Sequence, residues 1–337
     1  MSVTRHYCTY FDQRYLPRAL ALYQSLKEHG DDFCLWALCL DELSYQRLTA
    51  LNLQEMRPIS HEEFTRGDEQ LLAARGNRSL VEYYFTCSPS LPLFVLNADP
   101  AIDMITYLDA DLYFFASPEH LFGEIGPASI AIIPHRFPDA MRHLEENGIY
   151  NVSWITFRRD AEGLACLQRW RSQCLEWCYD RVEGTRYADQ GYLNDWPATY
   201  RNLIIIQQKG ANLAPWSISG YQLSFRNACV WVDDDPLIFF HFQSLAYVQS
   251  GTYALNLKKY KAKISRLIKV KIYAPYIKVL EEISREEQIP ITPGNLRDQV
   301  AEIKPWLTQY ILWLKNKLIL LKRIIEGGYM FPWEYRR

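Results

Sequence analysis

Short apolar runs alternate with helical patterns along the first 250 residues of this 337-residue chain. In the first such pair, residues 3–11 predict a strand and the apolar spacing over 16–26 predicts a helix, which Gly30 ends. Further strands are expected at 33–40, 102–108, 129–134, 152–157, 203–206 and 237–242, and further helices near 43–51, 79–97 and 160–180. This alternation is typical of an α/β domain, so we expect a mostly parallel sheet flanked by helices.

Charge is distributed unevenly along the chain. The formal net charge of −2 argues against a general nucleic-acid-binding protein. Residues 251–337 nevertheless hold 17 Lys and Arg against 8 Asp and Glu, which gives +9, and the other 20 and 31 give residues 1–250 a charge of −11. We therefore expect two parts, an α/β domain over 1–250 and a basic, aromatic-rich helical extension over 251–337.

The last helix of that extension is expected at about 296–326. It carries Trp306 and Trp313 beside Lys315 and Lys317. Large aromatic residues next to lysines suit a helix that lies in a membrane interface, and the basic charge suits an anionic membrane surface as a partner. The alternative is a helix that packs on the α/β domain and leaves its lysines in water.

Targeting signals and cysteines bear on the compartment. The N-terminus lacks the long apolar core of a signal peptide, and no run of about 18 uncharged apolar residues predicts a spanning helix. Most of the eight cysteines lie in apolar runs, which is typical of buried free thiols. Cys174 and Cys178 are four residues apart, but further soft ligands at metal-site spacing are missing. We expect a cytoplasmic protein that is peripheral on the inner face of the membrane.

The segment Tyr107-Leu-Asp-Ala-Asp111 carries the sharpest chemical signal. Asp109 and Asp111 directly follow an apolar strand and precede an apolar Leu-Tyr-Phe-Phe run. Ligands of open α/β sheets gather at the carboxyl ends of strands, where these carboxylates are expected. Two adjacent carboxylates inside apolar sequence would be costly without a cation, whereas a surface or capping pair would not be. The segment therefore predicts a divalent metal site with positions left for phosphate oxygens.

Two later segments place further polar residues beside predicted strands or helices. Asp189 and Gln190 follow the long helix near 160–180, where Asp189 could also be a simple helix cap. His241 ends the apolar run 237–242, where a lone histidine is more often a satisfied core residue than a ligand. His135 and Arg136 also end a strand, and we leave open whether they contact a ligand or serve the loop.

Taken in order, these segments resemble the GT-A-fold glycosyltransferases. The similarity is to the retaining group that includes glycogenin and the bacterial lipooligosaccharide galactosyltransferases. It is carried by the strand end at 7–12, the Tyr-Leu-Asp-x-Asp motif at 107–111, the segment at 150–154, the Asp-Gln motif with its Leu-Asn at 189–194, and the late His-Phe at 241–242. The resemblance identifies the chain as a divergent member of that group.

The resemblance implies the activity. It implies a metal-dependent transfer of a sugar, with retention, from a nucleotide-diphosphate sugar, with UDP favoured, to a glycan or glycolipid acceptor in cell-surface polysaccharide synthesis. The implied cofactor is Mn²⁺ or Mg²⁺.

The resemblance also implies a role for each matched residue. The metal ligands would be Asp109, Asp111 and His241. The catalytic residues facing the donor sugar would be Asp189 and Gln190. The donor nucleotide and sugar would contact Tyr10, Phe11, Asp12, Thr86, Asp109, Asp111 and Asn151.

The chain also departs from the pattern of the group. The late motif lacks the lysine that reaches the diphosphate, because Gln243-Ser-Leu-Ala follows Phe242. The third residue of the Asp-Gln motif is Gly191. Three alternatives remain open: an Asp-x-Asp phosphohydrolase, a sugar nucleotidyltransferase and a non-catalytic membrane scaffold. The first usually carries its motif on the first strand, and the second wants a glycine-rich loop after that strand.

Overall fold

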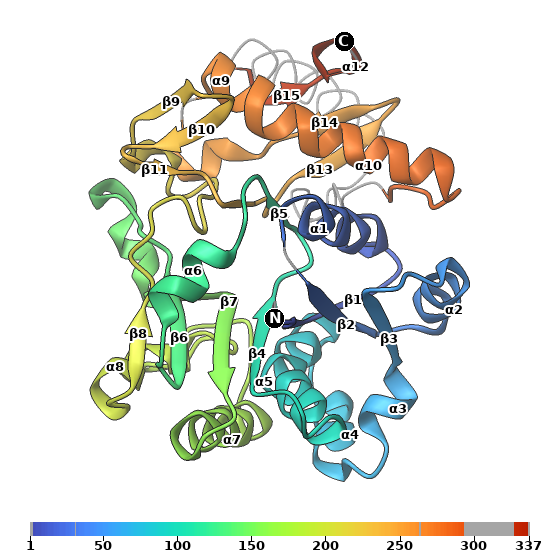
Figure 1. Cartoon of the computed structure of the whole chain (residues 1–337), viewed down its shortest axis with the longest axis vertical. Coiled ribbons are helices and arrows are strands. Elements are labelled where there is room, and N and C mark those ends of the chain that lie inside the picture. The colour runs from blue at the N-terminus through green and yellow to red at the C-terminus, as the bar shows by residue number, and fades with distance from the viewer. Residues whose placement is uncertain (1–2, 31, 263, 293–326, 336–337) are drawn as a thin grey trace, which may run out of the picture. The chain divides into compact units, whose positions relative to one another are not determined.

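The computed structural model describes residues 3–30, 32–262, 264–292 and 327–335 (Figure 1). The chain divides into two compact units, Met1–His241 and Phe242–Arg337.

A seven-stranded sheet forms the centre of the first unit, with the strand order β3-β2-β1-β4-β7-β6-β8. Only β7 runs against its two neighbours, and the remaining pairs are parallel. The strands are β1 (Arg5–Phe11), β2 (Phe33–Cys39), β3 (Met56–Ser60), β4 (Met104–Leu108), β6 (Ile130–Pro134), β7 (Tyr150–Arg158) and β8 (Leu203–Ile205). The expectation of a mostly parallel sheet flanked by helices is confirmed.

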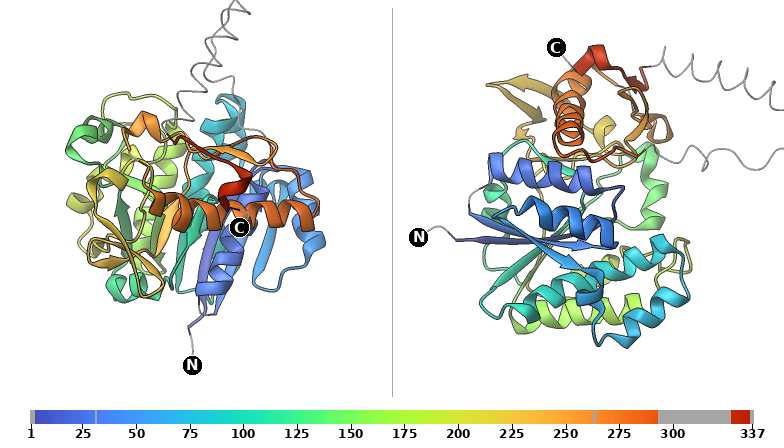
Figure 2. Two further views of the ribbon diagram at one scale, coloured as in Figure 1. Left: turned by 90° about the horizontal axis from the view of Figure 1, so that it is seen from above. Right: turned by 90° about the vertical axis from the view of Figure 1, so that its right-hand side faces the viewer.

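Helices cover both faces of this sheet, with α1 on one face and α5 and α7 on the other (Figure 2). The sequence sets where they begin: Ser79 and Glu82 form a capping box at α5, and Asp160 accepts the Gly163 N–H at the start of α7. The helices of the first unit are α1 (Leu16–His29), α2 (Glu42–Leu51), α3 (His61–Thr65), α4 (Glu69–Gly76), α5 (Leu80–Ala98), α6 (Glu119–Ile125), α7 (Ala161–Glu176) and α8 (Trp196–Thr199).

The main apolar core lies between the sheet and the α5–α7 layer. Phe157 on β7 packs against the rings of Trp170 and Trp196, with ring centroids 6.1 and 5.9 Å away. These three aromatic side chains are fully buried. Burial of apolar surface contributes about 25 cal/mol per Å², so the packing of this helix layer stabilises the central sheet.

Two smaller sheets complete the first unit. The pair β5 (Leu112–Phe114) and β12 (Phe239–His241) is antiparallel, with His241 opposite Leu112. The other sheet consists of β9 (Leu223–Arg226), β10 (Cys229–Val232) and β11 (Asp235–Pro236).

The second unit combines helices with a small antiparallel sheet. Its strands are β13 (Ala246–Gln249), β14 (Thr252–Ala254) and β15 (Tyr329–Met330), and its helices are α9 (Arg266–Ile268), α10 (Ala274–Glu286) and α12 (Pro332–Tyr335). The ring of Phe242 stacks on Tyr276 at 3.8 Å, and Lys269 forms an ion pair of 2.9 Å with Glu334. The sequence predicted a helical extension. Its described part contains helices and, in addition, the short strands β13, β14 and β15.

Three further expectations meet the structure as follows. The helix expected at 296–326 lies outside the described residues. All eight cysteines are free, and seven of them are buried. Within the described ranges, no helix combines the length and the apolar character that crossing a membrane requires.

Candidate active site

The two aspartates of the Asp-x-Asp segment lie in the turn between β4 and β5. The backbone of this turn is fixed, because the Asp109 N–H donates to the Ser153 carbonyl at 3.2 Å and its own carbonyl accepts from Leu112 at 3.3 Å. Strand β7 therefore holds Asp109 at the carboxyl end of β4. Asp111 is buried and Asp109 is partly buried.

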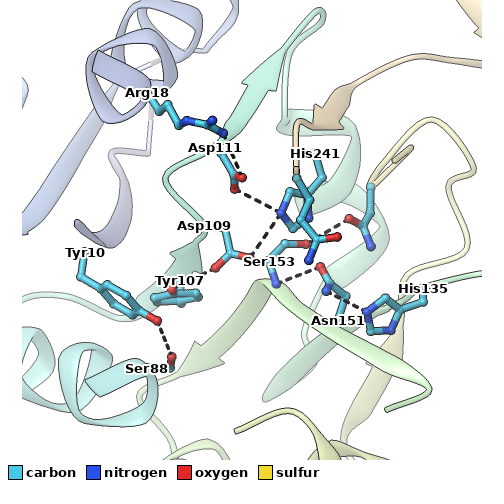
Figure 3. A network of polar contacts seen from close by, with 12 residues as sticks. Tyr10, Arg18, Ser88, Tyr107, Asp109, Asp111, His135, Asn151, Ser153 and His241 are labelled. Atoms are coloured by element: carbon cyan, nitrogen blue, oxygen red, sulfur yellow. Dashed lines mark hydrogen bonds and ion pairs between the residues drawn. The ribbon is translucent and has the colours of Figure 1, made fainter. Parts of the chain in front are cut away.

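His241 is the last residue of the first unit, and its side chain lies beside both aspartates (Figure 3). Its Nε2 lies 3.1 Å from Asp111 Oδ1 and 3.7 Å from Asp109 Oδ2. The antiparallel register of β12 on β5 produces this placement, and the His241 N–H donates to the Leu213 carbonyl at 2.9 Å. One ligand atom from each of the three residues lies within 4.8 Å of the other two.

The three groups perturb one another electrostatically. Burial raises the pKa of Asp109 to about 6. Burial would also raise the pKa of Asp111, but the charges of His241 and Arg18 outweigh it and hold that pKa below its usual value. Burial lowers the pKa of His241, and the facing carboxylates Asp111 and Asp109 raise it by more. In this cluster two carboxylates thus face one imidazole and one guanidinium, and each group shifts the pKa of its neighbours.

The donor set of this cluster fits a divalent cation. Two carboxylate oxygens and one imidazole nitrogen are ligands that Mn²⁺, Mg²⁺ and related ions accept, and the imidazole favours Mn²⁺ over Mg²⁺. His241 Nδ1 is buried and has no hydrogen-bond partner among the described atoms. The geometry therefore allows Asp109, Asp111 and His241 to hold one ion through Nε2 and two carboxylate oxygens.

Arg18 contacts the opposite oxygen of Asp111. Its Nη1 lies 3.5 Å from Asp111 Oδ2, and its guanidinium lies over the Tyr15 ring at 4.7 Å from the centroid. Arg18 is in the first turn of α1, where its apolar neighbours gave no sign of a functional residue. Asp111 therefore bridges the histidine and an arginine.

An aromatic group lies beside the acidic cluster at the end of β1. The Tyr10 ring packs against Tyr107 and Tyr84, with centroids 5.7 and 6.3 Å away, and its hydroxyl is 3.2 Å from Ser88 Oγ. The Tyr107 hydroxyl donates to Asp109 at 3.0 Å. Tyr10 is thus brought to the cluster as expected, and Tyr84 is an aromatic that sequence reasoning missed because it sits on α5.

Asp12 follows β1 and is already strongly paired. The Arg14 guanidinium donates to one of its oxygens at 2.6 and 2.9 Å, and the Arg14 N–H donates to the other at 2.9 Å. The Tyr84 hydroxyl also lies 3.5 Å from the carboxylate. A ligand that uses Asp12 must therefore share it with Arg14.

Asp189 is a third buried carboxylate near the cluster. Burial raises its pKa to about 7; the Ser88 hydroxyl opposes this rise and the charge of Asp109 adds to it. The preceding Ala188 has a φ of +44°, a left-handed conformation that costs a non-glycine residue about 1 kcal/mol. The Trp170 Nε1–H donates to the Asp189 carbonyl at 2.8 Å, which holds this backbone in place.

Gln190 is anchored to the C-terminal end of the 3-10 helix Asp139–Asn147. Its Nε2 donates to the Asn147 carbonyl at 2.6 Å. A Cβ on Gly148, which has a φ of +130°, would lie 3.1 Å from the Gln190 side chain, so glycine at this position lets the two approach. Within the described residues, the Gln190 amide oxygen accepts no hydrogen bond. It can therefore accept one from a ligand hydroxyl.

Asn151 belongs to a buried amide network on β7. Its Nδ2 donates to His135 Nε2 at 2.9 Å, and its Oδ1 accepts from the Ser153 N–H at 3.2 Å. The Ser153 hydroxyl donates to Asn212 Oδ1 at 3.1 Å. Burial lowers the pKa of His135 to about 3, so the ring is neutral and can accept this bond. His135 and the Ser153 backbone N–H thus fix the Asn151 amide (Figure 3).

Two of the expected donor contacts lie outside this network. Phe11 is 2% exposed and belongs to the core, because neighbouring strand residues point to opposite faces and Tyr10 takes the site side. The Thr86 hydroxyl donates back to the Glu82 carbonyl at 2.8 Å and accepts from Arg78, so it serves α5 rather than the cluster.

Arg136 serves its loop, since its guanidinium donates to the carbonyls of residues 206, 208 and 211.

Comparison with known proteins gives two relatives in Bacillus subtilis strain 168. No protein-family model matches the chain. The chain is 30% identical over 277 residues to "Uncharacterized protein YfnD", which covers 81% of this chain and 88% of that protein. It is also 30% identical over 256 residues to "Uncharacterized protein YfnF", which covers 73% of this chain and 83% of that protein.

Solved structures with a similar chain path are more distant. Mouse xyloside xylosyltransferase 1 in its apo form matches with a TM-score of 0.47 and 18% identity, over 72% of this chain and 98% of its own. The galactosyltransferase LgtC, solved with donor and acceptor sugar analogues, matches with a TM-score of 0.47 and 14% identity, over 88% of this chain and 100% of its own.

Proposed function

The chain belongs to the family of the Bacillus subtilis proteins YfnD and YfnF, and we propose that it is a metal-dependent glycosyltransferase of the GT-A fold. It moves a sugar from a nucleotide-diphosphate sugar to a glycan or glycolipid acceptor. The observation that carries the proposal is the convergence of Asp109, Asp111 and His241 at the carboxyl end of β4. His241 lies 130 residues after Asp111 in sequence, and it contacts both aspartates. Two capping aspartates or a histidine of the core would not need to meet in this way.

Asp109, Asp111 and His241 hold the metal ion in this proposal. A bound Mn²⁺ or Mg²⁺ supplies Lewis-acid stabilisation of the negative charge on the departing diphosphate. Tyr107 donates to Asp109 and keeps that carboxylate oriented for ligation. Asp111 and His241 are buried and Asp109 is partly buried, so electrostatic interactions among them are stronger than in water.

The aromatic group at the end of β1 receives the nucleobase in this proposal. Tyr10 stacks on the base, and Asp12 accepts from an imino N–H of uracil while Arg14 holds its carboxylate. UDP is the proposed nucleotide. The ring of Tyr84 lies 6.3 Å from Tyr10 and supports it from the side.

Asn151, Asp189 and Gln190 serve the donor sugar. Asn151, fixed by His135, and Asp189 hold sugar hydroxyls, and Gln190 stabilises the positive charge that develops at the anomeric carbon. No carboxylate is assigned as a nucleophile. The acceptor attacks on the face that the diphosphate leaves and the diphosphate takes its proton, so the product retains the anomeric configuration.

A donor screen tests this function. The full-length protein with Mn²⁺ is offered a panel of nucleotide sugars, and the released product is identified. Free nucleotide diphosphate is the expected product; inorganic phosphate would point to the phosphohydrolase, and pyrophosphate to the nucleotidyltransferase. Asp111→Asn should abolish release, while Asp139→Asn, which changes an exposed carboxylate paired with Arg142, should not. No release with any donor would contradict the proposal.

The cellular setting is part of the same proposal. A role in cell-surface polysaccharide synthesis and a peripheral position at the cytoplasmic face of a membrane would bring the enzyme to a lipid-linked acceptor. The support is the +9 formal charge of residues 251–337, since basic residues near anionic lipid attract a protein to the surface.

A further inference from the structure

Arg18 is the guanidinium that lies against the acidic cluster. It projects from the first turn of α1 and reaches Asp111 Oδ2 at 3.5 Å, on the side of the carboxylate away from His241 (Figure 3). Its side chain is 15% exposed, so most of it is already out of water. The Tyr15 ring beneath the guanidinium supports this position.

The contact between Arg18 and Asp111 differs from the tight arginine pair next to it. Arg14 holds Asp12 through two nitrogens at 2.6 and 2.9 Å, whereas Arg18 Nη1 lies 3.5 Å from Asp111 Oδ2. A guanidinium has five donors arranged as a planar fork, which matches phosphate oxygens as well as carboxylates. Arg18 therefore places a group with the geometry for phosphate recognition beside the proposed metal ligand Asp111.

The charge of the occupied site calls for a further cation. A divalent ion would balance Asp109 and Asp111, but the diphosphate of a donor would then add negative charge beside the buried Asp189. The first turn of α1 contains no acidic side chain, so the positive end of the helix dipole adds to the charge of Arg18. The local field at Arg18 therefore favours an anion next to the metal.

We propose that Arg18 binds the diphosphate of the nucleotide sugar. When the metal occupies its three ligands, the Arg18 guanidinium donates to phosphoryl oxygens from the α1 side, and it stabilises the diphosphate as the sugar departs. The assignment rests on the proposed function of the site and adds a residue that the sequence motifs do not contain.

Calorimetric titration of the full-length protein with Mn²⁺ tests Arg18 separately from turnover. Wild type, Arg18→Met and Arg18→Lys are titrated with UMP and UDP. In wild type, UDP should bind more tightly than UMP. Arg18→Met should reduce that difference about tenfold or more, because hydrogen bonds to charged groups contribute this much affinity. Arg18→Lys should restore part of the difference, since it keeps the charge but loses the fork.

Two controls make the result decisive. Lys27→Met removes an exposed cation from the same helix and should leave both affinities unchanged. Manganese affinity without nucleotide is measured by electron paramagnetic resonance. If Arg18→Met tightens Mn²⁺ binding but leaves the ratio of UDP to UMP affinity unchanged, Arg18 only neutralises Asp111 and the inference is wrong. If wild type binds neither UDP nor a panel of other nucleoside diphosphates, the proposed function fails as well.

Discussion

At the scale of single residues, Gln190 is the group whose contacts point to a role in the transition state. Its nitrogen is held by the Asn147 carbonyl and its side chain lies against Gly148, so its position is fixed before any ligand arrives. Preorganised dipoles of this kind stabilise charge that develops during a reaction.

Gln190→Ala should therefore lower kcat more than it raises the KM for the donor. A loss of about 10- to 1,000-fold in kcat is expected for removal of one such dipole. Steady-state kinetics with the donor found in the screen measures both constants. A variant with unchanged kcat and a raised KM would show that Gln190 contributes only to ground-state binding.

Asp189 is the residue where function and stability oppose each other. Its pKa is about 7 in the folded protein, above the value near 4 of an unfolded chain. Because the folded state then holds its proton more tightly, wild-type stability falls as the pH rises from about 4 to 7.

Asp189→Asn removes this buried charge. In the presence of EDTA, the variant should be about 2–4 kcal/mol more stable than wild type at pH 8, and this gain should shrink towards pH 4. Thermal unfolding at a series of pH values measures the difference, with the exposed Asp139→Asn expected to change stability by less than about 1 kcal/mol. A gain that does not depend on pH would contradict the assignment.

At the scale of elements, the loop before β12 positions His241. The Gly210 carbonyl accepts from the Ile238 N–H at 2.8 Å, and the Leu213 carbonyl accepts from the His241 N–H at 2.9 Å. A Cβ on Gly210 would lie 1.7 Å from the Pro236 carbonyl oxygen, which no side-chain movement can relieve. The backbone of this loop thus requires glycine for close approach rather than for its φ angle.

Gly210→Ala should destabilise the protein by about 3 kcal/mol or more and weaken Mn²⁺ binding, because β12 must move. Thermal unfolding and metal titration measure the two effects. Gly123→Ala is the matched control: its Cβ would meet no atom within 4 Å, and alanine favours the helix α6 by about 1 kcal/mol. Equal behaviour of the two variants would exclude this role for the loop.

Sequence patterns predicted the long buried strands and missed several of the short ones. The apolar runs of β1, β2, β4, β6 and β7 are clear because these strands are buried on both faces. Strand β3 was missed because Pro58 and the exposed Arg57 interrupt its pattern. Strand β5 was also missed, whereas β8 and β12, which have three residues as well, were predicted from the apolar runs 203–206 and 237–242.

The same limit applies to the candidate site. Asp109, Asp111 and His241 were found because each adjoins an apolar strand, a signal that lies within a few residues of sequence. Arg18 and Tyr84 lie on helices, where a polar residue at a helical position is ordinary, and only the packing of those helices brings them to the cluster. Local sequence thus predicts what a strand end carries, but not which helix side chains meet it.

At the scale of the whole molecule, charge asymmetry predicts how the protein behaves near lipid. Residues 251–337 carry +9 and residues 1–250 carry −11, and Trp333 is 65% exposed. Each basic residue near an anionic surface contributes about 1 kcal/mol, so several suffice for reversible binding.

The full-length protein should therefore sediment with vesicles that contain anionic phosphatidylserine and should remain in solution with phosphatidylcholine alone. The bound fraction should fall as salt rises, because the Debye length is about 8–10 Å at physiological ionic strength and shorter above it. A form cut near Gly251 serves as the control. Binding that is equal on both lipids, or unchanged in the shortened form, would defeat the expectation.

The pairing of β5 with β12 also has a consequence for biosynthesis. It joins residue 112 to residue 241, so both aspartates leave the ribosome long before the histidine that completes their site. Contacts between such distant residues close a large loop and form late. A nascent chain therefore exposes both aspartates without their histidine while residues 112–240 are being made, and we expect capture of the metal to follow the pairing of β12 with β5.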